Sequence, residues 1–147
     1  MSAMNKVEFS SMIEETSVNT ILCEYSIKRN NSIKLVAASL TDIIEDGLSM
    51  VYSFYEPELR DLSLGKYMIL DHVNLAKEMS LPYLYLGYWV AGSEKMAYKA
   101  QYEPLELFSN GKWSLHERSN QTKLRDNRTL SNDKEVTNTI YLPTSNL

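Results

Sequence analysis

Several residue types are scarce in this sequence, and each shortage excludes a class of protein. With one cysteine, Cys23, no disulfide bond can form within the chain, which fits a reducing compartment. No apolar run approaches the ~20 residues that span a bilayer, and residues 1–11 lack the apolar core of a signal peptide. We therefore expect a cytoplasmic protein with no membrane partner.

The sequence also lacks an excess of cationic side chains over anionic ones. The 147 residues include 15 lysines and arginines against 19 aspartates and glutamates, which gives a formal net charge of −4. Nonspecific binding along a nucleic acid needs a basic face. The balance argues against such binding and leaves open a pocket for the tip of a nucleic acid. The length suits a single domain with its own core.

Alternating apolar residues predict four strands, at residues 17–28, 33–39, 48–55 and 83–90. The first three follow one another through short polar turns, which predicts an antiparallel meander. Cys23 falls in the first strand, where we expect a buried side chain rather than a reactive nucleophile. A terminal hairpin is predicted from residues 105–108 and 112–115.

Three helices complete the predicted domain. Apolar residues spaced three and four apart predict an amphipathic helix over 64–79, with Ser63 as its N-cap. A short helix is expected over 7–14, and another over 94–102 with Ser93 as its N-cap.

This order of elements is typical of an α+β fold with an acetyltransferase-like (GNAT-like) core, a mostly antiparallel mixed sheet flanked by helices. We assign residues 1–116 to this domain. Residues 117–147 are rich in asparagine, serine, threonine and charge, and they lack a periodic apolar face, so we expect a flexible polar tail. Residues 140–142 are a candidate docking segment within it.

The helix after the third strand points its N-terminus at the ligand in such a fold. Here that N-terminus is Ser63, Leu64 and Gly65. Its first backbone N–H groups are free and the helix dipole favours negative charge, so an anion is expected there. Gly65 would let the ligand approach the backbone closely. The alternative is an ordinary capped helix that tolerates a glycine.

The strand over 83–90 and the helix after it carry the other candidate residues. Gly87 leaves a gap in one face of the strand, and Tyr85, Tyr88 and Trp89 surround it as stacking groups. Lys95 and Lys99 are four apart and share a helical face, which an anion between them would favour. The alternatives are rings that fill the core and lysines on a solvated face.

Two long segments resemble the C-terminal domain of the arginyl-tRNA–protein transferase family: GLSMVYSFYEPELRDLSLGKYMILDHV and LPYLYLGYWVAGSEKMAYKAQYEPLE. Within that family they look like the bacterial aspartate/glutamate leucyltransferases. The resemblance runs from about residue 16 to residue 113 and rests on several motifs in the right order.

The resemblance implies transfer of an aminoacyl group from the 3′ end of a tRNA to a protein that begins with Asp or Glu, in the N-end-rule degradation pathway. It requires no cofactor and no metal. The hypothetical catalytic residues are Tyr98, as proton donor, and Lys99. The hypothetical substrate-binding residues are Ser63, Leu64, Gly65, Tyr85, Gly87, Tyr88, Trp89 and Lys95.

The sequence also departs from the family. Its members carry a further cysteine-rich N-terminal domain, so we expect an N-terminally truncated enzyme with a separate cysteine-rich half as a partner. Leucine is the favoured donor and arginine stays open. One alternative is an inactive binding module for acidic N-termini, or one subunit of a split enzyme. An acyl-CoA N-acyltransferase would need a glycine-rich turn that DLSLGK lacks.

Overall fold

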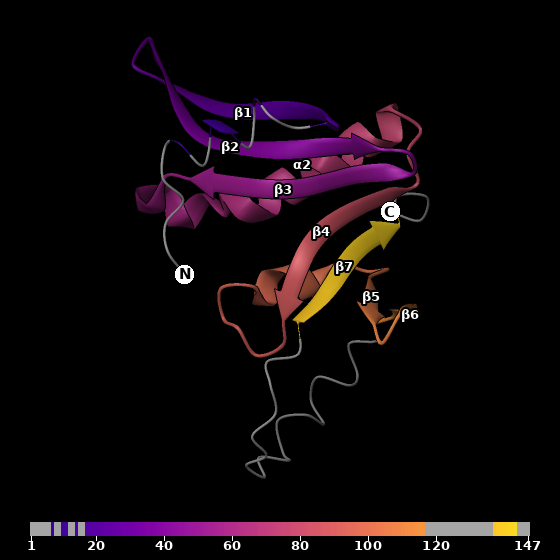
Figure 1. The fold of residues 1–147 in the computed structure, drawn as a ribbon. Helices are drawn as coiled ribbons and strands as arrows, with labels where there is room; N and C mark the ends of the chain where they lie inside the picture. The colour runs from indigo at the N-terminus through magenta and orange to yellow at the C-terminus, as the bar shows by residue number, and fades with distance from the viewer. Residues whose placement is uncertain (1–6, 8–9, 12–13, 15–16, 117–136, 144–147) are drawn as a thin grey trace.

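The computed structural model describes residues 7, 10–11, 14, 17–116 and 137–143. Its seven-stranded sheet has the order β1-β2-β3-β4-β7-β5-β6. Figure 1 shows helix α2 along one face of β1, β2 and β3, and β4 turning away from β3. The elements are β1 (Asn19–Arg29), β2 (Ser32–Ile44), β3 (Gly47–Tyr55), η1 (Pro57–Leu62), α2 (Leu64–Glu78), β4 (Tyr83–Val90), η2 (Ala97–Gln101), β5 (Glu106–Ser109), β6 (Lys112–Leu115) and β7 (Thr137–Pro143).

The first three strands form the predicted antiparallel meander, and β4 joins it in parallel. The parallel pairing is short, from Gly47 opposite Tyr83 to Ser49 opposite Tyr85. A side chain at Gly47 would meet the Tyr83 carbonyl oxygen at 2.6 Å, so only glycine permits this approach. Beyond it β4 leaves β3 and pairs with β7, which divides the sheet into two parts.

Helix α2 connects the two parts through its apolar face. Its first turns pack Leu64 and Met68 against the β2 residues Val36 and Ala37. Later turns place Ile69, Val73 and Ala76 in a core with residues of β3 and β4. Each large apolar side chain that is fully buried contributes roughly 1.5–3 kcal/mol. This packing fixes the start of α2 beside the carboxyl end of β3.

A buried polar chain also joins α2 to β2. His72, with no exposed surface, lies with Nε2 2.8 Å from Thr41 Oγ1 and Nδ1 2.7 Å from the Met68 carbonyl oxygen. A carbonyl only accepts, so Nδ1 carries the proton and Nε2 accepts from Thr41. Ser39 Oγ lies 3.2 Å from Thr41 Oγ1. Burial lowers the pKa of His72 below its usual value, so the ring is neutral.

Two predictions about the fold need correction. Residues 137–143 form strand β7 between β4 and β5, so this part of the expected flexible tail is a strand, and it contains the candidate docking segment 140–142. Its β-branched and aromatic residues suit a strand, and β4 would otherwise expose an edge. The remainder of the tail lies outside the described residues.

The second correction concerns the helix predicted over 94–102. The chain there forms turns followed by the shorter 3-10 helix η2. Bonds of the i to i+3 type run from Met96 N to the Ser93 carbonyl and from Lys99 N to the Met96 carbonyl. Of the helix predicted over 7–14, the four described positions are helical, and the others lie outside the described residues.

Candidate functional site

A pocket opens where β3 ends and α2 begins. It has a volume of about 260 Å³ and is lined by Tyr55, Arg60, Ser63, Leu64, Gly65, Lys66 and Tyr98. Tyr55 is the last residue of β3, and η1 folds the chain back so that the first turn of α2 lies at the same edge. Tyr98 comes from η2, a distant part of the sequence.

The backbone at the start of α2 offers two free donors. Lys66 N and Tyr67 N both donate to the Ser63 carbonyl, at 2.9 and 3.1 Å. The N–H groups of Leu64 and Gly65 make no hydrogen bond within the part of the chain that the structure describes. Two donors and the positive end of the helix dipole therefore face the pocket, an arrangement that favours an anion.

Ser63 has an unusual conformation at this point. It stands at the predicted N-cap position, but its φ of 50° and ψ of 41° are left-handed, and its hydroxyl makes no capping hydrogen bond. A non-glycine residue in this region costs about 1 kcal/mol or more, and such residues gather at functional sites. The exposed hydroxyl is thus available to a ligand.

Two cations border the pocket. Arg60 on η1 and Lys66 on α2 are exposed, and among the described residues neither forms a salt bridge. Glu58 and Asp61 also lie on η1, so η1 itself is not cationic overall. The positive character comes from the two cations that line the pocket together with the open amides.

Tyr98 brings a phenol to the first turn of α2. A side chain at Gly65 would lie 3.5 Å from both Cζ and Oη of Tyr98, so the hydroxyl faces the glycine across the pocket. Burial, and then the nearby Tyr55, raise the pKa of Tyr98. Tyr98 is therefore protonated at neutral pH, and a positioned phenol is one of the groups that act as general acids.

A neighbouring tyrosine holds η2 against the helix. The Tyr102 hydroxyl donates to the Lys66 carbonyl at 3.3 Å. Burial, followed by the nearby Tyr98, raises the pKa of Tyr102 to about 12. This bond attaches the chain that carries Tyr98 to the first turn of α2.

The predicted lysine pair does not form. Lys99 Nζ donates to the Leu86 carbonyl at 2.6 Å and to the Tyr88 carbonyl at 3.5 Å, beyond the point where β4 leaves β3. Burial lowers the pKa of Lys99, and Lys99 does not line the pocket. Lys95 is exposed on a turn. Since η2 begins only at Ala97, the two lysines share no helical face.

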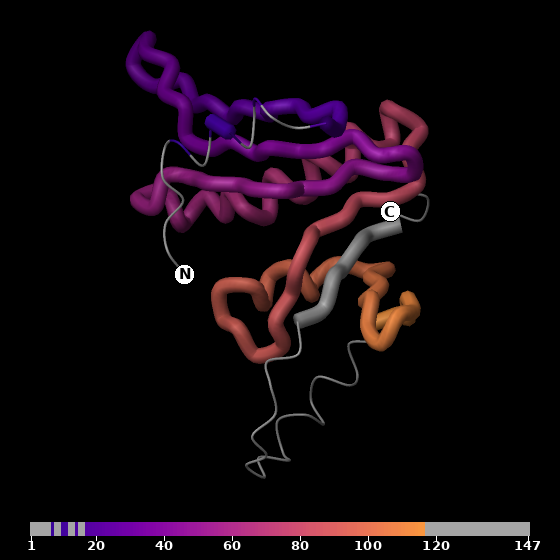
Figure 2. Tube along the Cα trace, viewed as in Figure 1, coloured from indigo at the N-terminus to yellow at the C-terminus, as the bar shows by residue number. Residues whose placement is uncertain are grey.

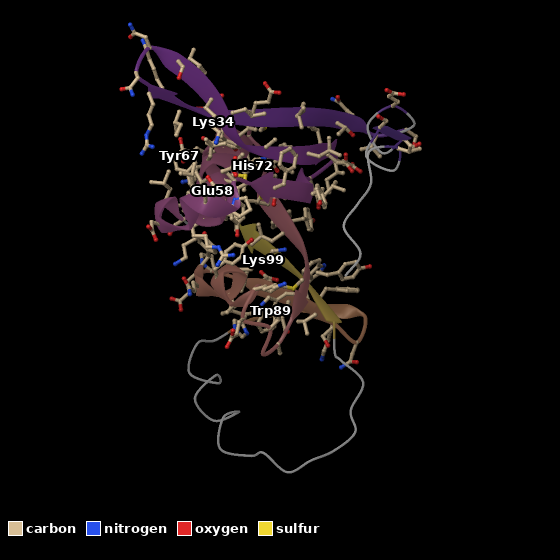
Figure 3. All side chains as sticks on the ribbon, turned by 90° about the vertical axis from the view of Figure 1, so that its left-hand side faces the viewer. Lys34, Glu58, Tyr67, His72, Trp89 and Lys99 are labelled. Carbon is tan, nitrogen blue, oxygen red and sulfur yellow. The ribbon has the colours of Figure 1, made fainter. Side chains whose placement is uncertain are left out.

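The aromatic residues of β4 also lie elsewhere than predicted. Gly87 has a φ of +73° at an irregularity in the β4–β7 register. Beyond it Tyr88 is exposed, and Trp89 is buried in the core with its indole N–H unpaired within the described chain. Tyr85 donates to Asp46 at 3.0 Å and lies against Trp113, with ring centroids 6.1 Å apart. Figure 3 shows Trp89 below Lys99, away from Glu58.

The structure thus unites part of the predicted site and adds residues that the sequence reasoning missed. Ser63, Leu64, Gly65 and Tyr98 meet in one pocket, as expected. Tyr55, Arg60 and Lys66 were not predicted. The sequence contained one signal for these residues. The last residue of β3 and the residues near Ser63 must lie at the same edge of the sheet.

Two further classes of site receive no support. Within the described ranges, no group of three or more His, Cys, Asp or Glu side chains is placed to hold a metal ion. Across the same residues, none of the helices has the length and apolar character needed to cross a membrane.

The single cysteine is not placed as a nucleophile. Cys23 is half-buried, and burial followed by Asp71 raises the pKa of its thiol, which disfavours the reactive thiolate.

Sequence comparisons agree on one group of proteins. Residues 1–109 match a family model described as the C terminus of arginine-tRNA-protein transferase. The chain is 52% identical over 114 residues to an aspartate/glutamate leucyltransferase of Ruegeria sp. (strain TM1040). It is 56% identical over 113 residues to the protein of the same name in Jannaschia sp. (strain CCS1). These matches cover 78% and 77% of this chain but only 41% and 39% of those relatives.

A solved structure shares the fold. The ribosomal-protein-S18-alanine N-acetyltransferase from Escherichia coli superposes with a TM-score of 0.53 over 99% of this chain and 96% of its own. Its sequence identity is 11%, so the likeness concerns the fold alone. It confirms the predicted acetyltransferase-like α+β core.

Proposed function

Because the chain belongs to the arginine-tRNA-protein transferase family, we propose that it transfers an aminoacyl group from the 3′ end of a tRNA to a protein with an N-terminal Asp or Glu. The names of its relatives favour leucine as the group transferred. The proposed acceptors are N-end-rule substrates in the cytoplasm. The observation that carries the proposal is the pocket that gathers free amides, two cations and a protonated phenol.

The proposed chemistry is aminolysis of an ester. The neutral α-amine of the acceptor attacks the ester carbonyl, a C–N bond forms, the ester C–O bond breaks, and the ribose hydroxyl leaves. The proton that the amine loses balances the proton that the leaving oxygen gains. An α-amine has a pKa of about 7.7–8.0, so part of it is already neutral near pH 7. The protein needs mainly to position the partners and stabilise the oxyanion.

Six of the seven residues that line the pocket have a role in this reaction. The Leu64 and Gly65 amides, with the Ser63 hydroxyl, hold the oxyanion or the terminal phosphate of the RNA. Arg60 and Lys66 add the charge that attracts an anionic substrate. Tyr98 gives its proton to the leaving ribose oxygen and regains one from the attacking amine.

Lys99, predicted as catalytic, and several of the predicted substrate-binding residues take supporting roles. Lys99 ties η2 to β4 and so positions Tyr98. Gly87 and Tyr88 lie where β4 diverges from β3, and Tyr88 offers an exposed ring on which a base stacks. Trp89 stabilises the core, and Tyr85 holds β4 to the turn at Asp46.

The test is transfer of radiolabelled leucine from Leu-tRNA to a peptide that begins with Asp. A peptide that begins with Asn is the matched control, because it differs only in lacking the carboxylate. We expect label on the Asp peptide and little on the Asn peptide. Label on both would contradict the proposed acceptor class, and label on neither would contradict the transferase.

A second candidate is a binding module of the same fold that does not turn over. It is favoured by the displacement of Tyr85, Trp89 and Lys99 from the pocket. Such a module would bind the Asp peptide in calorimetry and release no aminoacyl product. Activity that arises only on adding a separate cysteine-rich half would instead identify one subunit of a divided enzyme.

A further inference from the structure

A two-stranded arm projects from the sheet edge that carries the pocket. Strand β2 pairs with β3 only from Ala37 onward but with β1 as far back as Ser32. Glu56 N still donates to the Val36 carbonyl at 2.8 Å, so the four residues 32–35 continue past this last bond, over ~13 Å at the usual rise per residue. Figures 1 and 2 show this hairpin extending at the upper left, above the start of α2.

The charge of the arm is opposite to that of the chain. Residues 26–36 include Lys28, Arg29 and Lys34 and no acidic residue, although the whole chain has a net charge of −4. Lys28 and Arg29 are exposed near the tip, beside a turn formed by two asparagines with positive φ. Lys34, at the base, lies 3.2 Å from Glu56 and keeps 59% of its side chain exposed.

Part of this charge faces the same side as the pocket. Ile27 packs against the cluster that includes Leu64 and Met68, so it points toward α2. Lys34 is opposite Ile27 in the register, and paired residues share a face. Arg29 is two residues from Ile27 and lies on that face too. Figure 3 shows Lys34 above Tyr67 and Glu58, on the side of α2 and η1.

We propose that this arm binds the phosphate backbone of an RNA whose 3′ end occupies the pocket. The inference rests on the proposed function, which places an RNA tip beside Ser63 and Gly65. An RNA helix that leads to this tip must pass the pocket edge, and the arm extends from that edge. Duplex RNA is recognised mostly through its shape, phosphates and 2′-hydroxyls. Cations on a projecting hairpin suit such contacts and need no broad basic face.

The test compares two RNA probes by fluorescence anisotropy. One is an RNA hairpin with a single-stranded ACCA end, and the other is the tetranucleotide ACCA alone. In the double variant Arg29→Ala/Lys34→Ala, which removes the two cations on the face of Ile27, we expect hairpin affinity to fall roughly tenfold near 50 mM salt. The slope of log K against log salt should shrink by about 0.7–0.9 for each phosphate that the variant no longer neutralises. Binding of ACCA should not change.

Two control variants separate the arm from bulk charge. Arg29→Lys/Lys34→Arg keeps the charge and should keep the affinity. Lys77→Ala/Lys112→Ala removes the same charge from the far end of α2 and from β6, and it should leave hairpin binding within about twofold. Unchanged thermal melting would show that all variants are folded.

The outcomes distinguish the arm from the proposed function. Hairpin affinity that survives Arg29→Ala/Lys34→Ala, or that falls equally in Lys77→Ala/Lys112→Ala, overturns the arm while ACCA binding still supports the pocket. A wild-type chain that binds neither RNA overturns the proposed function and the arm with it. Phosphatidylserine vesicles are the third probe. If Arg29→Ala/Lys34→Ala kept its affinity for RNA and lost affinity only for the vesicles, the arm would bind a membrane surface and the RNA proposal would be overturned.

Discussion

Helix α2 carries two polar sites that differ in one respect. At its middle, His72 is fully buried and both ring nitrogens have partners, Thr41 Oγ1 and the Met68 carbonyl. At its start, the amides of Leu64 and Gly65 make no hydrogen bond within the described chain. The histidine is the residue type usually suspected of catalysis, yet the amides have the unused bonding capacity.

This difference indicates which polar groups serve folding and which serve function. A buried group whose bonds are complete has stabilised the fold and has no capacity left for a ligand. The left-handed Ser63 costs stability, and the open donors and two cations beside it, which form no salt bridge in the described chain, keep bonding capacity for an anion. We therefore propose that the start of α2 serves function and call it the functional end; the middle, which stabilises the fold, is called the structural end.

The variant Tyr98→Phe tests the functional end and should have the largest effect. The hydroxyl makes no hydrogen bond within the described residues, so its removal should leave the melting temperature unchanged. Loss of a general acid lowers a rate by typically 10²–10⁴-fold, and we expect at least about 10²-fold in leucine transfer at saturating substrate.

The matched control for that variant is Tyr102→Phe. Its hydroxyl donates to the Lys66 carbonyl, so this change should cost about 1 kcal/mol of stability and much less rate. A transfer rate that falls as far in Tyr102→Phe as in Tyr98→Phe would show that Tyr98 acts through packing.

The variant His72→Ala tests the structural end. It leaves a cavity and removes the partner of the buried Thr41 hydroxyl, so we expect a loss of about 3 kcal/mol in the free energy of unfolding. Urea denaturation measures this loss. The conservative change Thr41→Val should cost about 1–2 kcal/mol, because one ring nitrogen loses its partner. A wild-type stability in His72→Ala would contradict the structural role.

Much of the fold was predictable from periodicity. The pattern over 83–90 predicts β4 with its observed bounds, and the helix predicted over 64–79 differs from α2 by one residue. The pattern failed where tertiary pairing decides the structure. Strand β7 forms because β4 offers an edge, and η2 is shaped by the Lys99 bond to β4. Local sequence contains neither partner.

Only the part of the site at the start of α2 was predictable from the sequence. Ser63 to Gly65 follow from the position of a helix start, which the sequence marks. The faces of β4 do not follow, because the irregularity at Gly87 changes the alternation and sends Trp89 into the core. The sequence pattern does not single out Arg60 and Lys66, and only the return of the chain through η1 brings them to one pocket.

A milder test of the structural end uses pH. Burial lowers the pKa of His72 from its usual 6.5, whereas the hydrogen bond to the Met68 carbonyl and then Asp71 act in the opposite direction. The Tyr25 hydroxyl lies 3.3 Å from Nδ1. Below pH 6.5 the unfolded chain binds a proton that the folded chain does not. Stability should therefore fall as the pH drops below 6.5, by at most about 1.4 kcal/mol per pH unit.

The control for this pH dependence is the other of the two histidines. The slope of stability between pH 6.5 and 5 should shrink in His72→Gln and persist in His116→Gln. The reverse pattern, measured by urea denaturation at each pH, would remove the support for a buried neutral His72.

The variant Gly65→Ala should change stability the least. It separates the functional end of α2 from the structural end most clearly, because stability should rise while the rate of transfer falls. A methyl group at Gly65 would lie 3.5 Å from the Tyr98 hydroxyl, an ordinary contact, so Gly65→Ala should fold normally. Alanine is the better helix former, and we expect a gain of about 0.5 kcal/mol. The methyl group would occupy the space between the open amides and Tyr98, so transfer should fall about tenfold.

The same substitution at Gly47 is the matched control, since its methyl group would collide with the Tyr83 carbonyl at 2.6 Å and should lower the melting temperature. If Gly65→Ala gained stability and kept its full rate of transfer, the substrate would not pass between α2 and Tyr98. The open amides would then be an imperfection of the fold, and the contrast between the two ends of the helix would lose its functional meaning.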